Sequence, residues 1–322
     1  GIRPQSFDIC LQPFRRNPHT LQSARILGSS VGVDRMEDLR SEQRREAVRI
    51  ESEEFRERLH AAGAVGVRRA VRIRASAGTP AGAPLGDGEK RVHFIRHGQG
   101  FHNLLADLYR EVGKPFNSAT GDGGEHNPYK RPEVRDAPLT ELGRGQARQL
   151  QPSAKALAAE LVVTSPMVRA TQTALLAFSH LLDGTTTKVP FVAHEGCHEI
   201  AGVHTCDWRR DLAELRADFP MVDYTSAAIV EKDPTWNETV REPLTSLADR
   251  GYEFLLWLRD RPEKDVVVVS HFGWLFTLMN AVVECDDPKL KLGWLTCEMR
   301  SFCMRYEDGD APDAKRPRGA AP

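Results

Sequence analysis

Five short apolar segments constrain the fold of this chain more than any other feature of its sequence. Their length and their polar or turn-forming flanks are typical of strands, and helical patterns lie between most of them. Strands that alternate with helices form a parallel or mostly parallel sheet with helices on both faces. We therefore predict an α/β fold with three layers, α/β/α, around a mostly parallel central sheet. The predicted strands are residues 91–95, 161–164, 189–193, 266–269 and 299–306.

Helices and one long loop are predicted between these strands. Thr140 is a suitable N-cap, because its hydroxyl can accept a hydrogen bond from the first helical turn. Residues 113–138 are rich in Gly, Pro and Asn, and we expect them to form a long loop near the functional site. The predicted helices are residues 101–112, 140–159, 207–217 and 240–258, and one that Ser165-Pro166 opens and that carries Arg169.

The N-terminal part of the chain differs in composition from the rest. Residues 36–60 combine helix-forming residues with opposite charges four positions apart, which predicts a solvated surface helix rather than a partner-binding one. Residues 61–90 are rich in Ala, Gly, Arg and Pro and are interpreted as a linker. We predict an N-terminal extension over residues 1–88, a catalytic domain over 89–307 and a polar tail over 308–322, whose basic cluster 315–318 we expect to be disordered.

Composition bounds the classes of function. A formal net charge of −1 over 322 residues gives no support to a nucleic-acid or membrane-surface role. The six cysteines form no C-x-x-C pair and no zinc-like cluster, so we expect reduced thiols in a cytoplasmic protein. The chain begins at Gly1 rather than Met, which leaves open a targeting peptide ahead of it. The oligomeric state is not predicted.

The longest apolar run, residues 266–283, has the length of a membrane span. It contains Ser270, His271, Gly273 and Asn280, which a span does not favour. We interpret it as a buried strand that turns into a buried helix.

Charged and polar residues follow the predicted strands. The strand at 91–95 runs into Arg96-His97-Gly98, with Asn103 a few residues later, while Arg169, Glu199 and His271 follow other strands. Parallel strands present such residues at one edge of a sheet. Two arginines, two histidines and a carboxylate suit phosphoryl transfer: the arginines bind phosphate oxygens, one imidazole attacks phosphorus, and a carboxylic acid protonates the departing alkoxide. These six residues, from Arg96 to His271, form the candidate site.

These residues resemble the histidine phosphatase superfamily in its phosphoglycerate mutase-like branch. The resemblance implies a phosphoglycerate mutase-like fold, His97 as phosphorylated nucleophile, a phosphate pocket completed by Arg96, Arg169 and His271, and no metal or organic cofactor. Asn103 stands where the family has a further hydrogen-bonding pocket residue. The motifs that carry the resemblance are Arg96-His97-Gly98 with Asn103, Leu139-Thr140…Gly143…Gln146-Ala147, Thr164-Ser165-Pro166…Arg169-Ala170…Gln172-Thr173-Ala174 and Val268-Val269-Ser270-His271.

The proton donor has two candidates. The segment from Cys197 to Asp207 resembles plant and fungal phosphatase-like members, in which a glutamate at the position of Glu199 donates the proton. Glu195 is the alternative proton donor.

Other polar residues have structural interpretations. Asn103 is equally suited to cap a helix. The remaining histidines, His93, His102, His126, His180 and His194, are predicted to be structural or exposed.

Three functions are consistent with these motifs. Glycolytic mutases carry Glu-Ser and Trp-Asn pairs after Arg-His-Gly, whereas this chain has Gln99-Gly100 and His102-Asn103, which favours a phosphatase over a phosphotransferase. Phe272 replaces the aspartate of the acid-phosphatase branch. The third function consistent with the motifs is phosphate binding or regulation by a catalytically silent protein. We expect a small phosphorylated substrate whose identity residues 104–138 and 200–238 determine, with Lys130, Arg131, Arg135, Arg209 and Arg210 as candidate contacts for an acidic group.

Overall fold

The computed structural model describes residues 30–78, 82–114, 116, 126–184 and 186–309, with backbone alone for residues 30–41 and 43. The chain divides into two compact units, residues 1–43 and 44–322, and the sheet and the candidate site belong to the second. Cys10, most of the predicted polar tail and the first part of the predicted extension lie outside the described residues.

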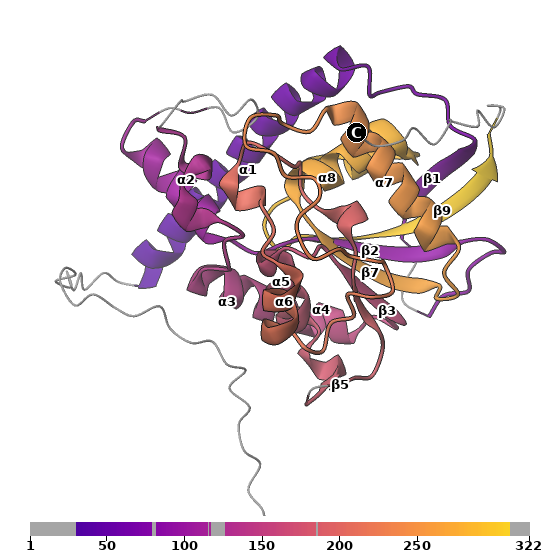
Figure 1. Cartoon of the computed structure of the whole chain (residues 1–322). Coiled ribbons are helices and arrows are strands. Elements are labelled where there is room, and N and C mark those ends of the chain that lie inside the picture. Colours follow the sequence, from indigo (N-terminus) through magenta and orange to yellow (C-terminus); the bar gives the residue numbers. More distant parts are fainter. Residues whose placement is uncertain (1–29, 79–81, 115, 117–125, 185, 310–322) are drawn as a thin grey trace, which may run out of the picture. The chain divides into compact units, whose positions relative to one another are not determined.

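A seven-stranded sheet lies at the centre of the second unit among the described residues (Figure 1). Strand β9 is antiparallel to its neighbours β1 and β2, and the other paired strands run parallel. The prediction of a mostly parallel sheet is thus confirmed. In spatial order the strands are β6 (Phe191–Ala193), β3 (Leu161–Thr164), β7 (Asp265–Ser270), β2 (Lys90–Arg96), β9 (Met299–Asp308), β1 (Val71–Ala77) and β8 (Glu284–Cys285).

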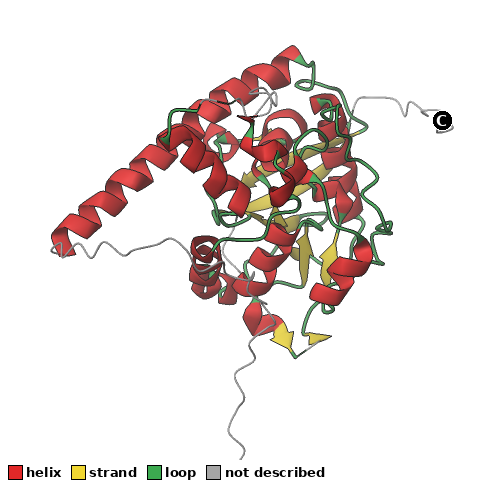
Figure 2. Cartoon of the chain, turned by 60° about the vertical axis from the view of Figure 1, so that its left-hand side comes forward, coloured by secondary structure: helices red, strands yellow, loops and turns green. Residues whose placement is uncertain are grey.

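Two hydrophobic cores lie on opposite faces of the sheet, because successive side chains of a strand point to opposite faces. Val266 and Val268 of β7 lie in the first core, and Val267 and Val269 lie in the second. The first core includes residues of α1 (Ser30–Ala61), α7 (Leu244–Arg259) and α8 (Phe272–Thr277). The second includes residues of α4 (Gln151–Lys155), α5 (Val168–Ala177) and α6 (Leu212–Asp218). Figure 2 shows the strands between these helices, which is the predicted three-layer arrangement.

The predicted helices are present, with several corrected boundaries. The helix predicted over residues 240–258 is α7, which begins at Leu244, and the helix predicted to open at Ser165-Pro166 is α5, which begins at Val168. The predicted helix 140–159 is two helices, α3 (Glu141–Gln149) and α4, because Pro152 at the start of α4 has no N–H to continue the helical ladder. The helix predicted from residue 207 begins at Leu212 as α6, while Asp207 ends the 3-10 turn η6 (Thr205–Asp207). Helix α2 (Phe101–Glu111) agrees with the prediction.

The described parts of residues 113–138 contain short helical turns. These are the 3-10 turns η2 (Pro128–Lys130) and η3 (Pro132–Val134). The other short elements of the described chain are η4 (Ser179–Leu181), β4 (Leu182–Asp183), β5 (Thr186–Thr187), η5 (Glu195–Cys197), η7 (Leu278–Val282) and η8 (Pro288–Lys291).

The prediction of a linker over residues 61–90 is wrong for residues 71–77. These form β1, which pairs with β9 along its whole length and with β8. The strand buries Ile73 and Ala75 and exposes Arg72 and Arg74. This alternation of apolar and charged residues is hard to recognise in so arginine-rich a segment. The sheet therefore begins before the predicted boundary near Gly88.

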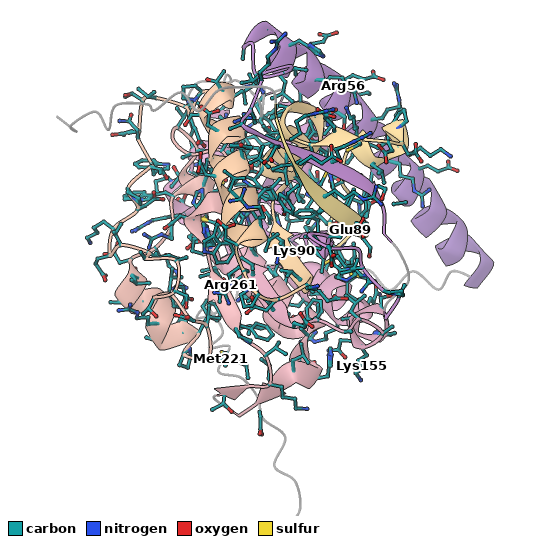
Figure 3. All side chains as sticks on the ribbon, turned by 90° about the vertical axis from the view of Figure 1, so that its right-hand side faces the viewer. Arg56, Glu89, Lys90, Lys155, Met221 and Arg261 are labelled. Atoms are coloured by element: carbon teal, nitrogen blue, oxygen red, sulfur yellow. The ribbon has the colours of Figure 1, made fainter. Side chains whose placement is uncertain are left out.

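Figure 3 shows Lys90, the first residue of strand β2, close to Arg261. The carbonyl of Arg261 accepts a hydrogen bond from the Lys90 ammonium at 2.6 Å.

Helix α1 is more than a solvated surface helix. Phe55 and Leu59 are buried in the first core, although many of the described side chains before them are exposed. Phe55 and Leu59 occur four positions apart on one face, and in residues 44–61, which belong to the second unit, this face packs in the first core.

The apolar run 266–283 is strand β7 followed by α8 and the π-helix η7, as predicted. No helix among the described residues has the length and apolar character needed to cross a membrane. Cys197, Cys206, Cys285, Cys297 and Cys303 are free thiols.

Candidate active site

The C-terminal ends of neighbouring parallel strands meet at one edge of the sheet. Arg96 at the end of β2 is paired with Ser270 at the end of β7. His97 and His271 follow these residues directly, and the His97 N–H donates to the Ser270 carbonyl at 2.9 Å. The two histidine rings consequently lie side by side, with centroids 5.0 Å apart.

A pocket lies at this edge, and five of the six predicted site residues line it: Arg96, His97, Asn103, Arg169 and Glu199. His271 is fully buried beside His97 and is not among the lining residues. The rest of the lining is Glu51, Phe55, His102, Tyr129, Ile200, His204, Cys206, Asp207, Arg241, Phe272 and Gly273.

The imidazole of His97 is held in a fixed orientation, with Nε2 unprotonated. Its Nδ1–H donates to the Gly98 carbonyl at 2.7 Å, so Nε2 carries the free lone pair. The Nε–H of Arg169 donates to that Nε2 at 3.3 Å. Burial, and next the positive charge of Arg169, hold the pKa of His97 well below its usual value. His97 therefore presents an unprotonated nitrogen at neutral pH.

His271 is oriented by a hydrogen bond between its Nε2 and the hydroxyl of Ser165, 2.7 Å apart. Its Nδ1 is buried without a hydrogen-bond partner in the described part of the chain. Burial and the nearby charge of Arg169 lower the pKa of His271 well below its usual value. This buried nitrogen is therefore available to form a hydrogen bond with an oxygen atom of a ligand.

Arg169 is almost completely buried, at 1% exposure, and each of its three guanidinium nitrogens donates a hydrogen bond. Besides the contact with His97, it donates to the Cys206 carbonyl at 2.7 Å and to Asp207 Oδ1 at 2.9 Å. Asp207 also accepts from Arg241 at Oδ2, at 2.9 Å. Burial alone would raise the pKa of Asp207, but Arg241, His204 and Arg169 together hold it well below its usual range. One carboxylate thus positions two arginines of the pocket.

Arg96 and Asn103 are the remaining predicted site residues that line the pocket. The guanidinium of Arg96 donates to the Trp294 carbonyl at 2.5 Å and lies over the Phe272 ring, 5.0 Å from its centroid. Asn103 Oδ1 accepts from the Gly100 N–H at 3.0 Å and so caps helix α2. Both readings of Asn103 thus apply, because it caps the helix and lines the pocket.

Glu199 and Glu195 lie in different environments. Glu199 lines the pocket, and its carboxylate accepts the N–H groups of Ile200, Gly273 and Trp274 at 3.0–3.1 Å. Glu195 is outside the pocket lining, and its Oε1 lies 2.7 Å from Arg209 Nε. Of the two candidates, only Glu199 is placed beside His97 and Arg96 in the pocket.

Two residues outside the predicted site hold Glu199 in place. A Cβ on Gly273 would lie 2.5 Å from Glu199 Oε1, so only glycine lets the carboxylate approach this helix start. Arg250 of α7 donates to the carbonyls of Gly196, His198 and Glu199 at 2.8–3.1 Å. The loop that carries Glu199 is thereby tied to a helix of the first core.

The motifs that follow the first strand position the backbone next to His97. Gly98 N–H donates to Thr173 Oγ1 at 3.0 Å, and Gln99 N–H donates to Gln146 Oε1 at 2.9 Å. Thr140, the predicted N-cap, accepts from Gly143 N–H at 3.0 Å. Residues on α3 and α5 that are distant in sequence therefore bind the loop 98–99.

Comparisons with known proteins place the chain in a family. A sequence model of the histidine phosphatase superfamily (branch 1) matches residues 127–309, more than half of the chain. The chain is 34% identical over 245 residues to a phosphoglycerate mutase-like protein of Arabidopsis thaliana, and this match covers 67% of the chain and 84% of the relative. The chain belongs to the histidine phosphatase superfamily.

Further relatives carry similar names. A phosphoglycerate mutase-like protein 1, also from Arabidopsis thaliana, is 32% identical over 247 residues, with 67% of this chain and 81% of the relative covered. A probable phosphatase of Schizosaccharomyces pombe is 26% identical over 227 residues, with 68% of this chain and 93% of the relative covered. Membership of the histidine phosphatase superfamily and these names support a phosphatase or mutase activity.

Several pocket residues of this histidine phosphatase superfamily member were not found from the sequence. His102, which was predicted to be structural or exposed, is buried and lines the pocket, with its ring centroid 5.7 Å from that of His97. Its position at the start of the helix that follows Arg-His-Gly was an available signal. Tyr129, His204, Asp207 and Arg241 lie on loops far apart in the sequence, where no periodic pattern points to them.

Other predicted contacts lie outside the pocket lining, which contains none of the basic residues proposed to bind an acidic group. Arg209 is fully buried and donates to the carbonyls of Arg210 and Val230 at 2.8 and 2.9 Å, so it has a structural role. Arg135 stacks on the Trp208 ring, 4.0 Å from its centroid. His93, in contrast, is structural as predicted, with Nε2 2.9 Å from Asp265.

The one group of potential metal ligands found among the described residues is poorly suited to a cation. His204, Cys206 and Asp207 offer ligand atoms within 4.8 Å of one another. Both oxygens of Asp207 already accept from guanidinium groups, whose positive charges would oppose a metal ion. Burial raises the pKa of the Cys206 thiol well above its usual value, which opposes thiolate formation.

Proposed function

We propose that this protein is a phosphatase that hydrolyses small phosphate monoesters in two steps through a phosphohistidine on His97. The observation that carries the proposal is the orientation of the His97 imidazole. Its Nδ1–H is bound to the Gly98 carbonyl, which leaves the Nε2 lone pair beside Arg169 in the pocket.

In the first step, Nε2 of His97 attacks phosphorus and the bond from phosphorus to the ester oxygen breaks. The positive charges of Arg96 and Arg169 stabilise the negative charge on the equatorial phosphoryl oxygens. The Nδ2 of Asn103 and the Nδ1 of His271 lack protein partners in the described chain and are suited to bind the same oxygens. Glu199 acts as the general acid and gives a proton to the departing alkoxide.

In the second step, the Glu199 carboxylate removes a proton from a water molecule, and the resulting nucleophile attacks the phosphohistidine. The bond between phosphorus and Nε2 breaks, inorganic phosphate leaves, and His97 and the protonated Glu199 are regenerated. If a second hydroxyl compound replaced water, the same site would act as a phosphotransferase. Gln99 and His102 stand where glycolytic mutases carry other residues, which supports water as the acceptor.

The first experiment measures hydrolysis of p-nitrophenyl phosphate in the presence of a metal chelator. We expect turnover in the wild-type protein and a loss of at least about 1,000-fold in kcat for His97→Ala. His60→Ala is the matched control, since His60 is exposed on α1 and makes no contact with the pocket. Equal turnover in His97→Ala and wild type, or activity that the chelator abolishes, would contradict the proposal.

The second experiment identifies the acceptor. The products of a panel of phosphorylated metabolites are separated, with and without added alcohols. We expect inorganic phosphate as the main product. A phosphorylated alcohol in excess of inorganic phosphate would show a phosphotransferase instead.

A further inference from the structure

Helix α1 brings a carboxylate to the pocket from outside the predicted catalytic domain. Glu51 lines the pocket together with Arg96 and Glu199. In the described chain it makes no hydrogen bond and no ion pair, in contrast to Glu199, which accepts three N–H groups. Glu51 is thus a pocket carboxylate with unused acceptor capacity.

The packing of α1 fixes Glu51 relative to the catalytic residues. Phe55, one helical turn later on the same face, is 4% exposed. Its ring meets Phe272 edge-on at 6.3 Å and Phe276 at 5.4 Å. Because Phe272 directly follows His271, this contact ties the helix to the strand end that carries the second histidine.

Two further contacts hold this part of the helix. A Cβ on Gly293 would lie 2.1 Å from Ser52 Oγ, so the chain at Gly293 passes very close to the residue after Glu51. The Nε–H of Arg56, which Figure 3 places on this helix, donates to Asn280 Oδ1 at 3.4 Å. Glu51 is therefore positioned by packing on both sides.

The charges around Glu51 favour a ligand that donates hydrogen bonds. Burial and the nearby Glu199 raise the pKa of Glu51, against the opposing effect of Arg96 and Arg110. The other two pocket arginines, Arg169 and Arg241, already donate to Asp207, each at 2.9 Å. The pocket thus presents two acidic side chains, Glu51 and Glu199.

We propose that Glu51 is a specificity-determining residue that accepts a hydrogen bond from a hydroxyl or ammonium group on the alcohol part of the substrate. An alcohol part that carries a carboxylate is disfavoured, because it would meet the carboxylate of Glu51. This inference rests on the proposed hydrolysis at His97 and adds the chemical class of the substrate.

The test compares phosphate monoesters whose alcohol parts differ only at the far end: ethyl phosphate, 2-hydroxyethyl phosphate, phosphoethanolamine and phosphoglycolate. For each, kcat/KM is measured in wild type, Glu51→Gln and Glu51→Ala. Glu57→Ala is the control, since Glu57 is an exposed carboxylate on the same helix, outside the pocket lining. Alanine is a good helix former, so these variants preserve α1.

Relative to ethyl phosphate, we expect phosphoethanolamine to lose about tenfold in kcat/KM in both Glu51 variants, because both remove the negative charge. The hydroxyethyl ester should lose its advantage in Glu51→Ala alone, since glutamine still accepts a hydrogen bond. Phosphoglycolate should improve in both variants, and Glu57→Ala should keep the wild-type ratios.

A fall in the ratio for one donor-bearing ester alone would identify that donor as the ligand of Glu51. Ratios in Glu51→Ala equal to those of wild type for both esters would overturn the inference while leaving hydrolysis at His97 intact. A folded wild-type protein that hydrolyses none of the esters would overturn both.

Discussion

The floor and the wall of the pocket differ in origin. The floor consists of residues at or after the ends of parallel strands, Arg96, His97 and Arg169, with His271 buried beside His97. The wall consists of residues on helix α1 and on connecting segments, Glu51, Tyr129, His204 and Arg241. Floor residues are held by the sheet register and by buried hydrogen bonds. Wall residues are held by the packing of segments that meet only in the folded chain.

This difference suggests a division of labour. In the proposed mechanism, the floor supplies the nucleophile and the positive charges that bind the phosphoryl group of any ester. The wall would then surround the alcohol part of the substrate. Substitutions in the floor should therefore reduce turnover of every ester, and substitutions in the wall should change the preference among esters.

Arg169 and Arg241 give the sharpest contrast, because both guanidinium groups bind Asp207, one at each oxygen. Arg169→Lys should lower kcat/KM about 1,000-fold for all esters, since lysine cannot contact His97, Asp207 and phosphate together. Arg241→Lys should cost less than about tenfold and depend on the ester. Steady-state kinetics on the ester panel measure both. Equal losses in the two variants would abolish the distinction between floor and wall.

Glu199 and Glu195 should separate chemistry from stability. Glu199→Gln should lower kcat about 100-fold or more for alkyl phosphates, because the alkoxide then lacks its proton donor. The loss in the first step should be smaller for p-nitrophenyl phosphate, whose leaving group needs no proton. Glu195→Gln should keep kcat and lower the free energy of unfolding by roughly 1–3 kcal/mol, because it weakens the pair with buried Arg209.

Urea unfolding and turnover of both glutamate variants provide the measurement. The reverse result, an inactive Glu195→Gln and a normal Glu199→Gln, would show that the proton donor is Glu195.

His194 follows a strand as His97 does, yet it packs against Phe254 and Trp257 and takes no part in the pocket. Burial, with Arg250, lowers its pKa to about 4. The unfolded state then binds more protons than the folded state below about pH 6.5, so stability falls as the pH drops from there towards 4. At pH 5 this one group should cost about 2 kcal/mol.

The check is urea unfolding at pH 7 and pH 5 in wild type and His194→Asn, in which Asn Oδ1 replaces Nδ1 as the acceptor of the Gly196 N–H. The variant should lose about 2 kcal/mol less than wild type between the two pH values. Identical losses would mean that His194 titrates normally in the fold.

Asn103 should show two small and separable effects. Asn103→Ala should cost about 1 kcal/mol of stability through the lost cap and about tenfold in kcat/KM through the lost amide donor. Asn103→Asp keeps the acceptor for the Gly100 N–H and places a negative charge beside the phosphate. It should therefore be more stable and less active than Asn103→Ala. The opposite order of activities would remove Asn103 from the phosphate-binding residues.

The floor was predictable because its residues lie next to apolar strands. The alternation before Arg96 and the valines before Ser270 indicate where strands end, and parallel strands bring those ends together. Strand β1 was missed because its arginines resembled linker composition, although Ile73 and Ala75 alternate as a strand requires. Glu51 and Asp207 could not be found in this way, since only tertiary packing brings them to the pocket. Local sequence patterns do not indicate which distant segments pack against each other in the folded chain.

The most direct test of the account is to trap the covalent intermediate. Glu199→Gln is mixed with p-nitrophenyl phosphate, quenched in alkali after one turnover time, digested and examined by tandem mass spectrometry. The account predicts one phosphoryl group on the imidazole of His97, stable in base and lost in acid, and none in the double variant Glu199→Gln/His97→Ala. Hydrolysis with no phosphorylated histidine, or a phosphoryl group on another residue, would contradict it.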